Sequence, residues 1–268
     1  MIGIFDSGAG GMSVFREIVR LLRYEKYVYF SDNAHCPYVG KSVEYIRDRA
    51  REITRLLLAR GAGIIVVACN TATAAAIETL RKEFPDTRFI GMEPAVKPAA
   101  LGTKSGVIGV LATAGTLSGS RYLAARGRYE DDINVIDHVG EGFVELVEKG
   151  ILSGEEAEKT VRASLAPLLD AGADTIVLGC THYPFLAGLM QRIAGPSVKI
   201  IDPAPAVARH LVNVMMQEGL LSEKEAEAAL QRKNAGIPEN PDIEIIASGD
   251  PEPSRRILKL LTQDSTEA

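Results

Sequence analysis

The chain has 268 residues, of which 46% are hydrophobic and 24% are charged. This composition is typical of a folded globular protein and excludes a disordered or fibrous chain. The length corresponds to one large domain or two ordinary ones, with a core that needs no disulfide or metal for stability. Because the formal net charge is −5 and no long basic run is present, we expect no nucleic-acid partner and no membrane partner.

The cysteine content and the first residues predict a cytoplasmic protein. Three cysteines are too few for a disulfide framework, and their odd number indicates free thiols in a reducing compartment. Met1 and Ile2 lead directly into an apolar, strand-like run, so we expect no cleavable targeting segment. The longest apolar stretches, such as Ile64–Cys69, are far shorter than the roughly 20 residues that span a bilayer.

Short β-branched runs alternate with longer amphipathic stretches along almost the whole chain. In chain order, the expected strands are Ile2–Phe5, Tyr27–Ser31, Gly63–Cys69, Arg88–Met92, Val107–Leu111, Ile133–His138, Thr175–Cys180, Val198–Asp202 and Ile243–Ser248. The expected helices are Met12–Arg23, Val43–Arg60, Thr73–Glu83, Glu155–Ala171, Ala204–Glu218 and the charged, solvated segment Ser222–Gly236, followed by a frayed tail from Gln263 to Ala268. The alternation, with several continuously apolar strands, predicts an α/β fold with mainly parallel sheets covered by helices.

Two segments of the chain are similar to each other and predict two lobes. Ala62–Thr71 and Ala173–His182 each pass from a small-residue turn through a buried strand into cysteine and small polar residues. We expect a discontinuous first α/β lobe, residues 1–93 plus 206–268, and a second α/β lobe, residues 94–205.

Two glycine-containing segments are similar to phosphate-binding loops but do not complete the pattern. A dinucleotide-binding fingerprint that includes Gly8 and Gly10 requires a third glycine where the chain has Ser13. The segment Gly40-Lys41-Ser42 is similar to the end of a P-loop whose first glycine falls on His35. We therefore expect no nucleotide cofactor, and a tight turn between strand and helix accounts for residues 8–11.

Cys69 and Cys180 each end an apolar strand and precede a helix, at the sheet edge where ligands bind. A single free cysteine is commonly a small buried hydrophobe, but two at equivalent strand ends, each followed by hydrogen-bonding residues, favour a functional site. The sequence has no CxxC pair and its histidines are scattered, so we expect no metal site and no dithiol redox motif. Cys36 follows no comparable strand and is interpreted as a bystander.

Two thiols from equivalent lobes fit the inversion of a carbon stereocentre without a cofactor. One thiolate removes a proton from one face of the carbon while the opposite thiol delivers a proton to the other face. Because a free cysteine has a pKa of about 8.5 and is only about 3% ionised at pH 7, each thiol needs help from a neighbour. His182 is the expected neighbour of Cys180, and Asp6, a carboxylate at the end of a buried strand, is the expected relay for Cys69.

Several motifs, in order along nearly the whole chain, carry a resemblance to a known family. They are Asp6-Ser7-Gly8 with Gly10-Gly11, Pro37-Tyr38, Cys69-Asn70-Thr71-Ala72-Thr73-Ala74, Ala112-Thr113 with Gly115-Thr116, and Gly179-Cys180-Thr181-His182-Tyr183-Pro184. The chain resembles glutamate racemase, of the cofactor-independent aspartate/glutamate racemase family. The resemblance implies a cytoplasmic enzyme, often a homodimer, that makes D-glutamate for peptidoglycan synthesis. It also implies two α/β lobes with the active site in the cleft between them.

The resemblance also implies roles for individual residues. Cys69 would serve the D-glutamate face and Cys180 the L-glutamate face, while Asp6, His182 and Glu148 would be auxiliary catalytic groups. The implied substrate contacts are Asp6, Ser7, Pro37, Tyr38, Val39, Gly40, Asn70, Thr71, Thr113, Thr116, Thr181 and His182. Neutral hydroxyl, amide and backbone donors of this kind can hold two carboxylates.

The chain departs from the family pattern at two places, and two other functions remain open. Val39 stands where the family usually has glycine, and Gly140-Glu141-Gly142 stands where members often have Cys-Pro. Some members of the family have an N-terminal extension that is associated with activation by a cell-wall precursor. Because this chain starts at the first strand, we expect no such activation.

Two alternative functions remain open. One is a racemase for aspartate or another amino acid on the same plan, and the other is a non-catalytic amino-acid-binding module.

Overall fold

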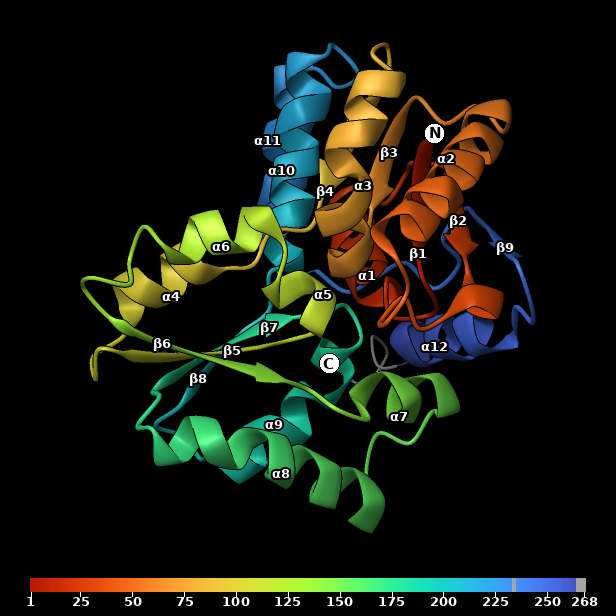
Figure 1. Cartoon of the computed structure of the whole chain (residues 1–268). Helices are drawn as coiled ribbons and strands as arrows, with labels where there is room; N and C mark the ends of the chain where they lie inside the picture. The colour runs from red at the N-terminus through yellow and green to blue at the C-terminus, as the bar shows by residue number, and fades with distance from the viewer. Residues whose placement is uncertain (233–234, 264–268) are drawn as a thin grey trace.

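The computed structural model describes residues 1–232 and 235–263 of the chain. Most of the expected frayed tail and two residues of the expected helix Ser222–Gly236 lie outside the described residues. The described chain forms two parallel sheets, each flanked by helices (Figure 1). The predicted α/β fold with two parallel-sheet units is therefore confirmed.

The first sheet has the strand order β4-β3-β1-β2-β9, and each neighbouring pair is parallel. Its strands are β1 (Ile2–Asp6), β2 (Tyr27–Ser31), β3 (Ile64–Val67), β4 (Arg88–Gly91) and β9 (Ile243–Ala247). The helices that follow these strands or pack beside them are α1 (Met12–Leu21), α2 (Val43–Ala59), α3 (Asn70–Glu83), α10 (Ala204–Gln217), α11 (Glu223–Gln231) and α12 (Glu252–Gln263). Every residue of β1, β2 and β3 is buried, as expected for strands covered on both faces.

The second sheet has the order β6-β5-β7-β8, again with parallel neighbours. Its strands are β5 (Val107–Ala112), β6 (Asn134–Val139), β7 (Thr175–Gly179) and β8 (Lys199–Ile201). Its helices are α4 (Val96–Gly102), α5 (Ala114–Leu117), α6 (Ser120–Arg126), α7 (Phe143–Lys149), α8 (Glu155–Asp170) and α9 (Ala187–Ala194). Two 3₁₀ turns, η1 (Asn33–His35) and η2 (Tyr183–Leu186), complete the described elements.

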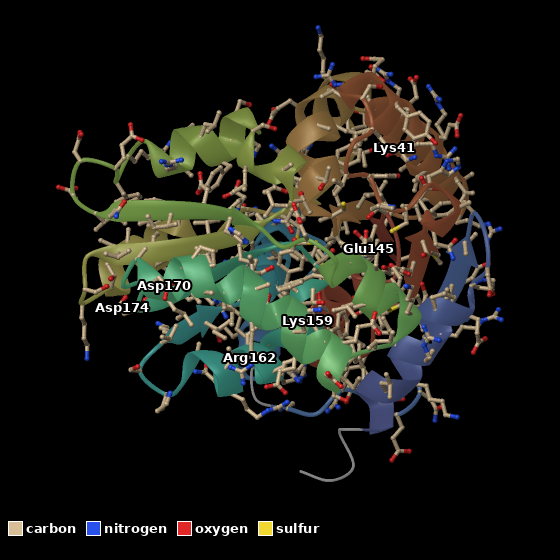
Figure 2. All side chains as sticks on the ribbon, turned by 60° about the horizontal axis from the view of Figure 1, so that its bottom comes forward. Lys41, Glu145, Lys159, Arg162, Asp170 and Asp174 are labelled. Atoms are coloured by element: carbon tan, nitrogen blue, oxygen red, sulfur yellow. The ribbon has the colours of Figure 1, made fainter. Side chains whose placement is uncertain are left out.

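Helix α8 illustrates how the amphipathic pattern covers a sheet. Val161, Leu165 and Leu168 are buried in the core of the second sheet. Lys159 and Arg162 lie on the opposite, exposed face of the helix (Figure 2). Within the described residues, none of the helices combines the length and apolar character needed to cross a bilayer.

The distribution of strands supports a division into two lobes. The first sheet takes its strands from residues 1–93 and 206–268, and the second sheet takes its strands from residues 94–205. Helix α10 begins at Ala204 and packs against α1 and β4 of the first sheet. We propose that these two groups of residues are the two lobes, with the second crossover in the first turn of α10.

Candidate active site

Residues at the carboxyl ends of four strands, two from each sheet, form the candidate site. Asp6 is the last residue of β1, and Cys69 follows two residues after the end of β3. Thr113 and Cys180 directly follow β5 and β7 of the second sheet. Because the strands of each sheet are parallel, their carboxyl ends meet at one edge, and side chains from both edges line one cavity.

The cavity is small and contains both thiols. It is lined by Ser7, Pro37, Tyr38, Val39, Cys69, Asn70, Thr71, Thr113, Val144, Cys180, Thr181 and His182. Its free volume is about 10 Å³, which is room for about one water molecule. An amino acid the size of glutamate therefore enters only when the two sides of the cavity move apart.

Cys69 caps the N-terminus of helix α3. The Ala72 N–H donates a hydrogen bond of 3.4 Å to Sγ of Cys69, which itself lies 3.7 Å from Oγ of Ser7. The expected helix start at Thr73 was therefore wrong: α3 begins at Asn70, because the thiol takes the capping position. Burial and the nearby Asp6 raise the pKa of Cys69, and the Ala72 N–H opposes that rise.

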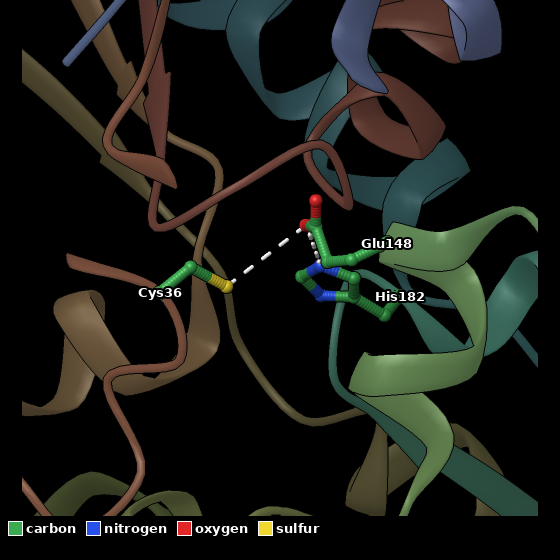
Figure 3. Close-up of side chains that lie close together, drawn as sticks. All are labelled: Cys36, Glu148 and His182. Atoms are coloured by element: carbon green, nitrogen blue, oxygen red, sulfur yellow. Dashed lines mark hydrogen bonds and ion pairs between the residues drawn. The ribbon is translucent and has the colours of Figure 1, made fainter. Parts of the chain in front are cut away.

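The imidazole of His182 links Cys180 to Glu148. Nδ1 of His182 lies 3.8 Å from Sγ of Cys180, and Nε2 lies 2.6 Å from Oε1 of Glu148 (Figure 3). Burial by itself lowers the pKa of His182, but hydrogen bonds to Cys180 and Glu148 outweigh burial and raise it. Burial by itself raises the pKa of Glu148, but the same contact with His182 outweighs burial and lowers it. Each of the two groups therefore favours the charged form of the other.

Asp6 is completely buried and held mainly by backbone groups. Its Oδ2 accepts hydrogen bonds from the N–H groups of Gly8 and Gly11, at 3.2 and 3.0 Å. Thr181 Oγ1, from the opposite side of the cavity, donates to Oδ1 at 3.4 Å. Burial raises the pKa of Asp6, and the charge of His182 opposes that rise. Asp6 thus contacts the segment after Cys180, and its charge contributes to the raised pKa of Cys69.

The glycines after β1 allow this close approach. A Cβ atom on Gly8 would overlap the carboxylate of Glu148, and one on Gly10 would overlap the ring of His182. Neither glycine has a positive φ angle, so the turn itself does not require glycine there. The expected tight turn is present, but contact with His182 and Glu148 is the stronger reason for these two residues.

Hydroxyl and amide groups complete the polar lining of the cavity. The hydroxyl of Thr113 is 2.9 Å from that of Thr71 and 3.0 Å from that of Thr116, which joins the two sheets by a chain of hydroxyls. Asn70 is buried, and among the described residues neither its Oδ1 nor its Nδ2 finds a hydrogen-bond partner. Such a group is poised to bind a polar ligand, because an unpaired buried amide is otherwise costly.

The segment Pro37–Val39 lines the cavity, while Gly40 is exposed and lies outside the lining. Tyr38 is held by Asp32, whose carboxylate accepts a 2.6 Å hydrogen bond from the phenol and bonds of 2.8 and 3.0 Å from Arg49. Sequence reasoning missed Asp32 and Arg49. Asp32 directly follows β2, so the strand-end argument applied to Asp6 identifies this carboxylate as well.

Cys36 lies closer to the site than its sequence context indicates. Its half-buried Sγ is 3.9 Å from Oε1 of Glu148. Together with His182, these residues place three potential metal-ligand atoms within 4.8 Å of one another. Sequence analysis interpreted Cys36 as a bystander, because nothing in the local sequence indicates that the loop after η1 packs against α7.

Comparisons with known proteins agree with this site. The sequence profile of the family described as Asp/Glu/Hydantoin racemase matches residues 2–211. The glutamate racemase of Ectopseudomonas mendocina is 47% identical over 244 residues, 88% of this chain and 93% of the relative. Among solved structures, glutamate racemase isoform RacE1 of Bacillus anthracis has a TM-score of 0.81 and 31% identity, covering 97% of this chain and 92% of that chain.

A glutamate racemase of Francisella tularensis, solved in complex with D-glutamate, has a TM-score of 0.78 and 26% identity. That match covers 98% of this chain and 93% of the solved chain. These findings confirm the resemblance read from the cysteine motifs and support an isomerase. The chain belongs to the Asp/Glu/hydantoin racemase family, and within that family it matches the glutamate racemases.

Proposed function

We propose that the protein interconverts L- and D-glutamate by a two-base mechanism that uses Cys69 and Cys180. The observation that carries this proposal is that the two thiols come from different sheets and line one small cavity. A hydrolase with a nucleophilic cysteine requires only one such thiol. Two thiols on opposite sides match the two faces of one α-carbon.

The proton balance of the reaction is simple. With L-glutamate bound, the Cys180 thiolate takes the α-proton and becomes a thiol, and the Cys69 thiol gives its proton to the opposite face and becomes a thiolate. The product is D-glutamate, and the enzyme is left ready for the reverse reaction. The two thiols exchange protonation states at each turnover, so no cofactor is consumed.

The neighbours of each thiol support this division of work. The imidazolium of His182, 3.8 Å from Sγ of Cys180, stabilises the Cys180 thiolate and can exchange a proton with it. Glu148 contacts His182 rather than the cavity, so we propose it as a residue that positions the imidazole. Asp6, whose pKa is raised by burial, is proposed as the proton relay on the Cys69 side.

Neutral donors are proposed to bind the two carboxylates of glutamate. Asn70, whose amide atoms are unpartnered among the described residues, and the hydroxyls of Ser7, Thr71, Thr113 and Thr181 face the cavity or support its lining. None of the described residues that line the cavity carries a permanent positive charge. The loop Pro37–Val39 adds further contacts, whereas Thr116 supports Thr113 and Gly40 shapes the loop.

The setting of the reaction is proposed from the family resemblance. We propose a cytoplasmic homodimer that supplies D-glutamate for peptidoglycan synthesis. The proposal includes no cofactor, nucleic-acid partner or membrane partner.

A substrate panel tests the proposed function. The full-length protein, dialysed against a chelator, is incubated separately with L- and D-glutamate and with L- and D-aspartate, and the enantiomers are separated by chiral chromatography. We expect both glutamate enantiomers to approach a racemic mixture without added cofactor, and aspartate to react far more slowly. Faster turnover of aspartate than of glutamate would show that aspartate is the substrate. Loss of turnover after the chelator treatment would contradict a metal-free mechanism.

A further inference from the structure

Cys36, Glu148 and His182 form a compact group of metal-ligating side chains beside the cavity (Figure 3). Oε1 of Glu148 lies 3.9 Å from Sγ of Cys36 and 2.6 Å from Nε2 of His182. We propose that this group binds a thiophilic divalent cation, with Zn²⁺ as the best chemical match, and that the bound ion inhibits racemisation. The binding stands independently of the proposed function, whereas the inhibition rests on it.

The donor set selects the class of ion. One sulfur, one imidazole nitrogen and one carboxylate oxygen suit Zn²⁺, whereas Mg²⁺ and Ca²⁺ prefer oxygen ligands alone. Ligand atoms around a tetrahedral zinc ion are about 3.5 Å apart, and the three atoms here already lie within 4.8 Å of one another. Cys36 and Glu148 are partly exposed, so an ion has access from solvent and a water molecule can fill the fourth position.

The surrounding charge favours a cation at this place. The carboxylate of Glu148 lies 3.9 Å from Sγ of Cys36, and its negative charge acts on that thiol together with the charge of Asp6. Zinc binding forms Zn–S, Zn–N and Zn–O bonds at Cys36, His182 and Glu148. These bonds replace the hydrogen bond between Nε2 of His182 and Oε1 of Glu148, and the protons displaced from Sγ and Nε2 pass to solvent. The Ala9 N–H, 2.7 Å from Oε1 of Glu148, orients the carboxylate as an outer-shell contact.

An ion at this site disables the proposed relay on the Cys180 side. The ring of His182 points Nε2 at Glu148 and Nδ1 at Sγ of Cys180. An ion on Nε2 leaves the remaining ring proton on Nδ1, directed at Cys180. With Nε2 bound to the ion, the ring can no longer become the imidazolium that is proposed to stabilise the Cys180 thiolate and exchange a proton with it.

The same ion also links the two sides of the cavity. Cys36 belongs to the loop after β2 of the first sheet, while Glu148 and His182 come from segments around the second sheet. The cavity between them has a free volume of about 10 Å³ and must widen to admit glutamate. A bridge through zinc opposes this widening, so inhibition is expected to be relieved by a chelator.

Cobalt(II), a coloured substitute for zinc, tests the site directly. We expect the chelator-treated full-length protein to show a thiolate-to-cobalt charge-transfer absorption on titration with Co²⁺. The band should be lost in Cys36→Ser. It should be retained in Cys69→Ser, the matched control, because Cys69 lines the cavity but is not one of the proposed ligands. No band in the parent protein, or an equal band in Cys36→Ser, would overturn the proposed site.

Zinc inhibition provides the second readout. Before zinc is added, Cys36→Ser should racemise glutamate at close to the parent rate. It should then need at least about 10-fold more Zn²⁺ than the parent protein for half-inhibition. Equal sensitivity of the two proteins would overturn the inhibitory role. Absence of racemisation in the metal-free parent would instead refute the proposed function, and the cobalt band would still decide the site.

Discussion

Gly10 and His182 pack so closely that a Cβ atom on Gly10 would overlap the imidazole ring. This contact joins the loop after β1 to the segment after β7. It fixes the ring that connects Cys180 to Glu148. The absence of a side chain at residue 10 is therefore part of how the imidazole is positioned.

The first prediction concerns this contact. Gly10→Ala should displace the imidazole and lower kcat by about 10²-fold, because a shift of roughly 1 Å in a catalytic group has a cost of this order. Steady-state kinetics with L-glutamate measures the effect. Gly188→Ala is the matched control, because a Cβ there meets open space. Activity of Gly10→Ala equal to that of the control would show that the ring has room to move.

The second prediction concerns the thiols. Cys69→Ser and Cys180→Ser should each reduce racemisation by at least about 10²-fold, since a serine hydroxyl is hardly ionised at pH 7 and is a poor proton acceptor. Cys36→Ser is the control and should remain active. Chiral chromatography gives the rates, and circular dichroism checks folding. A folded Cys69→Ser or Cys180→Ser protein with near-parent activity would refute the two-base assignment.

The third prediction concerns the pH dependence of stability. The contribution of Glu148, whose pKa is lowered by folding, is present above about pH 4.5 and is lost as the pH falls through the folded pKa. The contribution of His182, whose pKa is raised, is complete below about pH 6.5 and is lost as the pH rises through the folded pKa. The ion pair should therefore stabilise the fold most between these two values.

Glu148→Gln measures this contribution. Urea denaturation should show a loss of about 2 kcal/mol in the free energy of unfolding, greatest between about pH 4.5 and 6.5. Glu145→Gln, at an exposed position in the same helix (Figure 2), is the control and should have little effect. A loss that is the same at every pH would contradict the ion pair.

The fourth prediction concerns the support of Tyr38. Asp32→Asn should destabilise the protein by about 2 kcal/mol, because it removes the charge of the buried carboxylate that pairs with the partly exposed Arg49. It should also raise KM for glutamate, since Asp32 holds Tyr38 against the cavity. Tyr38→Phe removes only one hydrogen bond, so its cost should be nearer 1 kcal/mol. Equal unfolding free energies for the two variants would show that Arg49 contributes little.

The strands were predictable because their signal is local. Each of the nine expected strands is present, with ends within two residues of the prediction. The run Ile64–Val67 shows why: four consecutive buried apolar residues are typical of a parallel strand covered on both faces. The ends of these strands then located Asp6, Cys69 and Cys180.

Short elements and contacts between distant segments were not predictable in this way. Helix α7 has seven residues between two glycines with positive φ, Gly142 and Gly150, which is too short for a clear helical period. Only the family resemblance pointed to Glu148, which α7 carries. The contact of Cys36 with Glu148 depends on how the η1 loop packs against α7, and neither segment contains a local sign of it.

The most direct test of the two-base mechanism is the position of solvent deuterium after the first turnovers. The protein is incubated with unlabelled L-glutamate in D₂O, and both enantiomers are separated early and analysed by mass spectrometry. Because Cys180 removes the proton from one face and Cys69 delivers another to the opposite face, we expect deuterium in nearly all the D-glutamate formed, while recovered L-glutamate remains unlabelled. Rapid labelling of the recovered L-glutamate, or an unlabelled D-product, would contradict the mechanism.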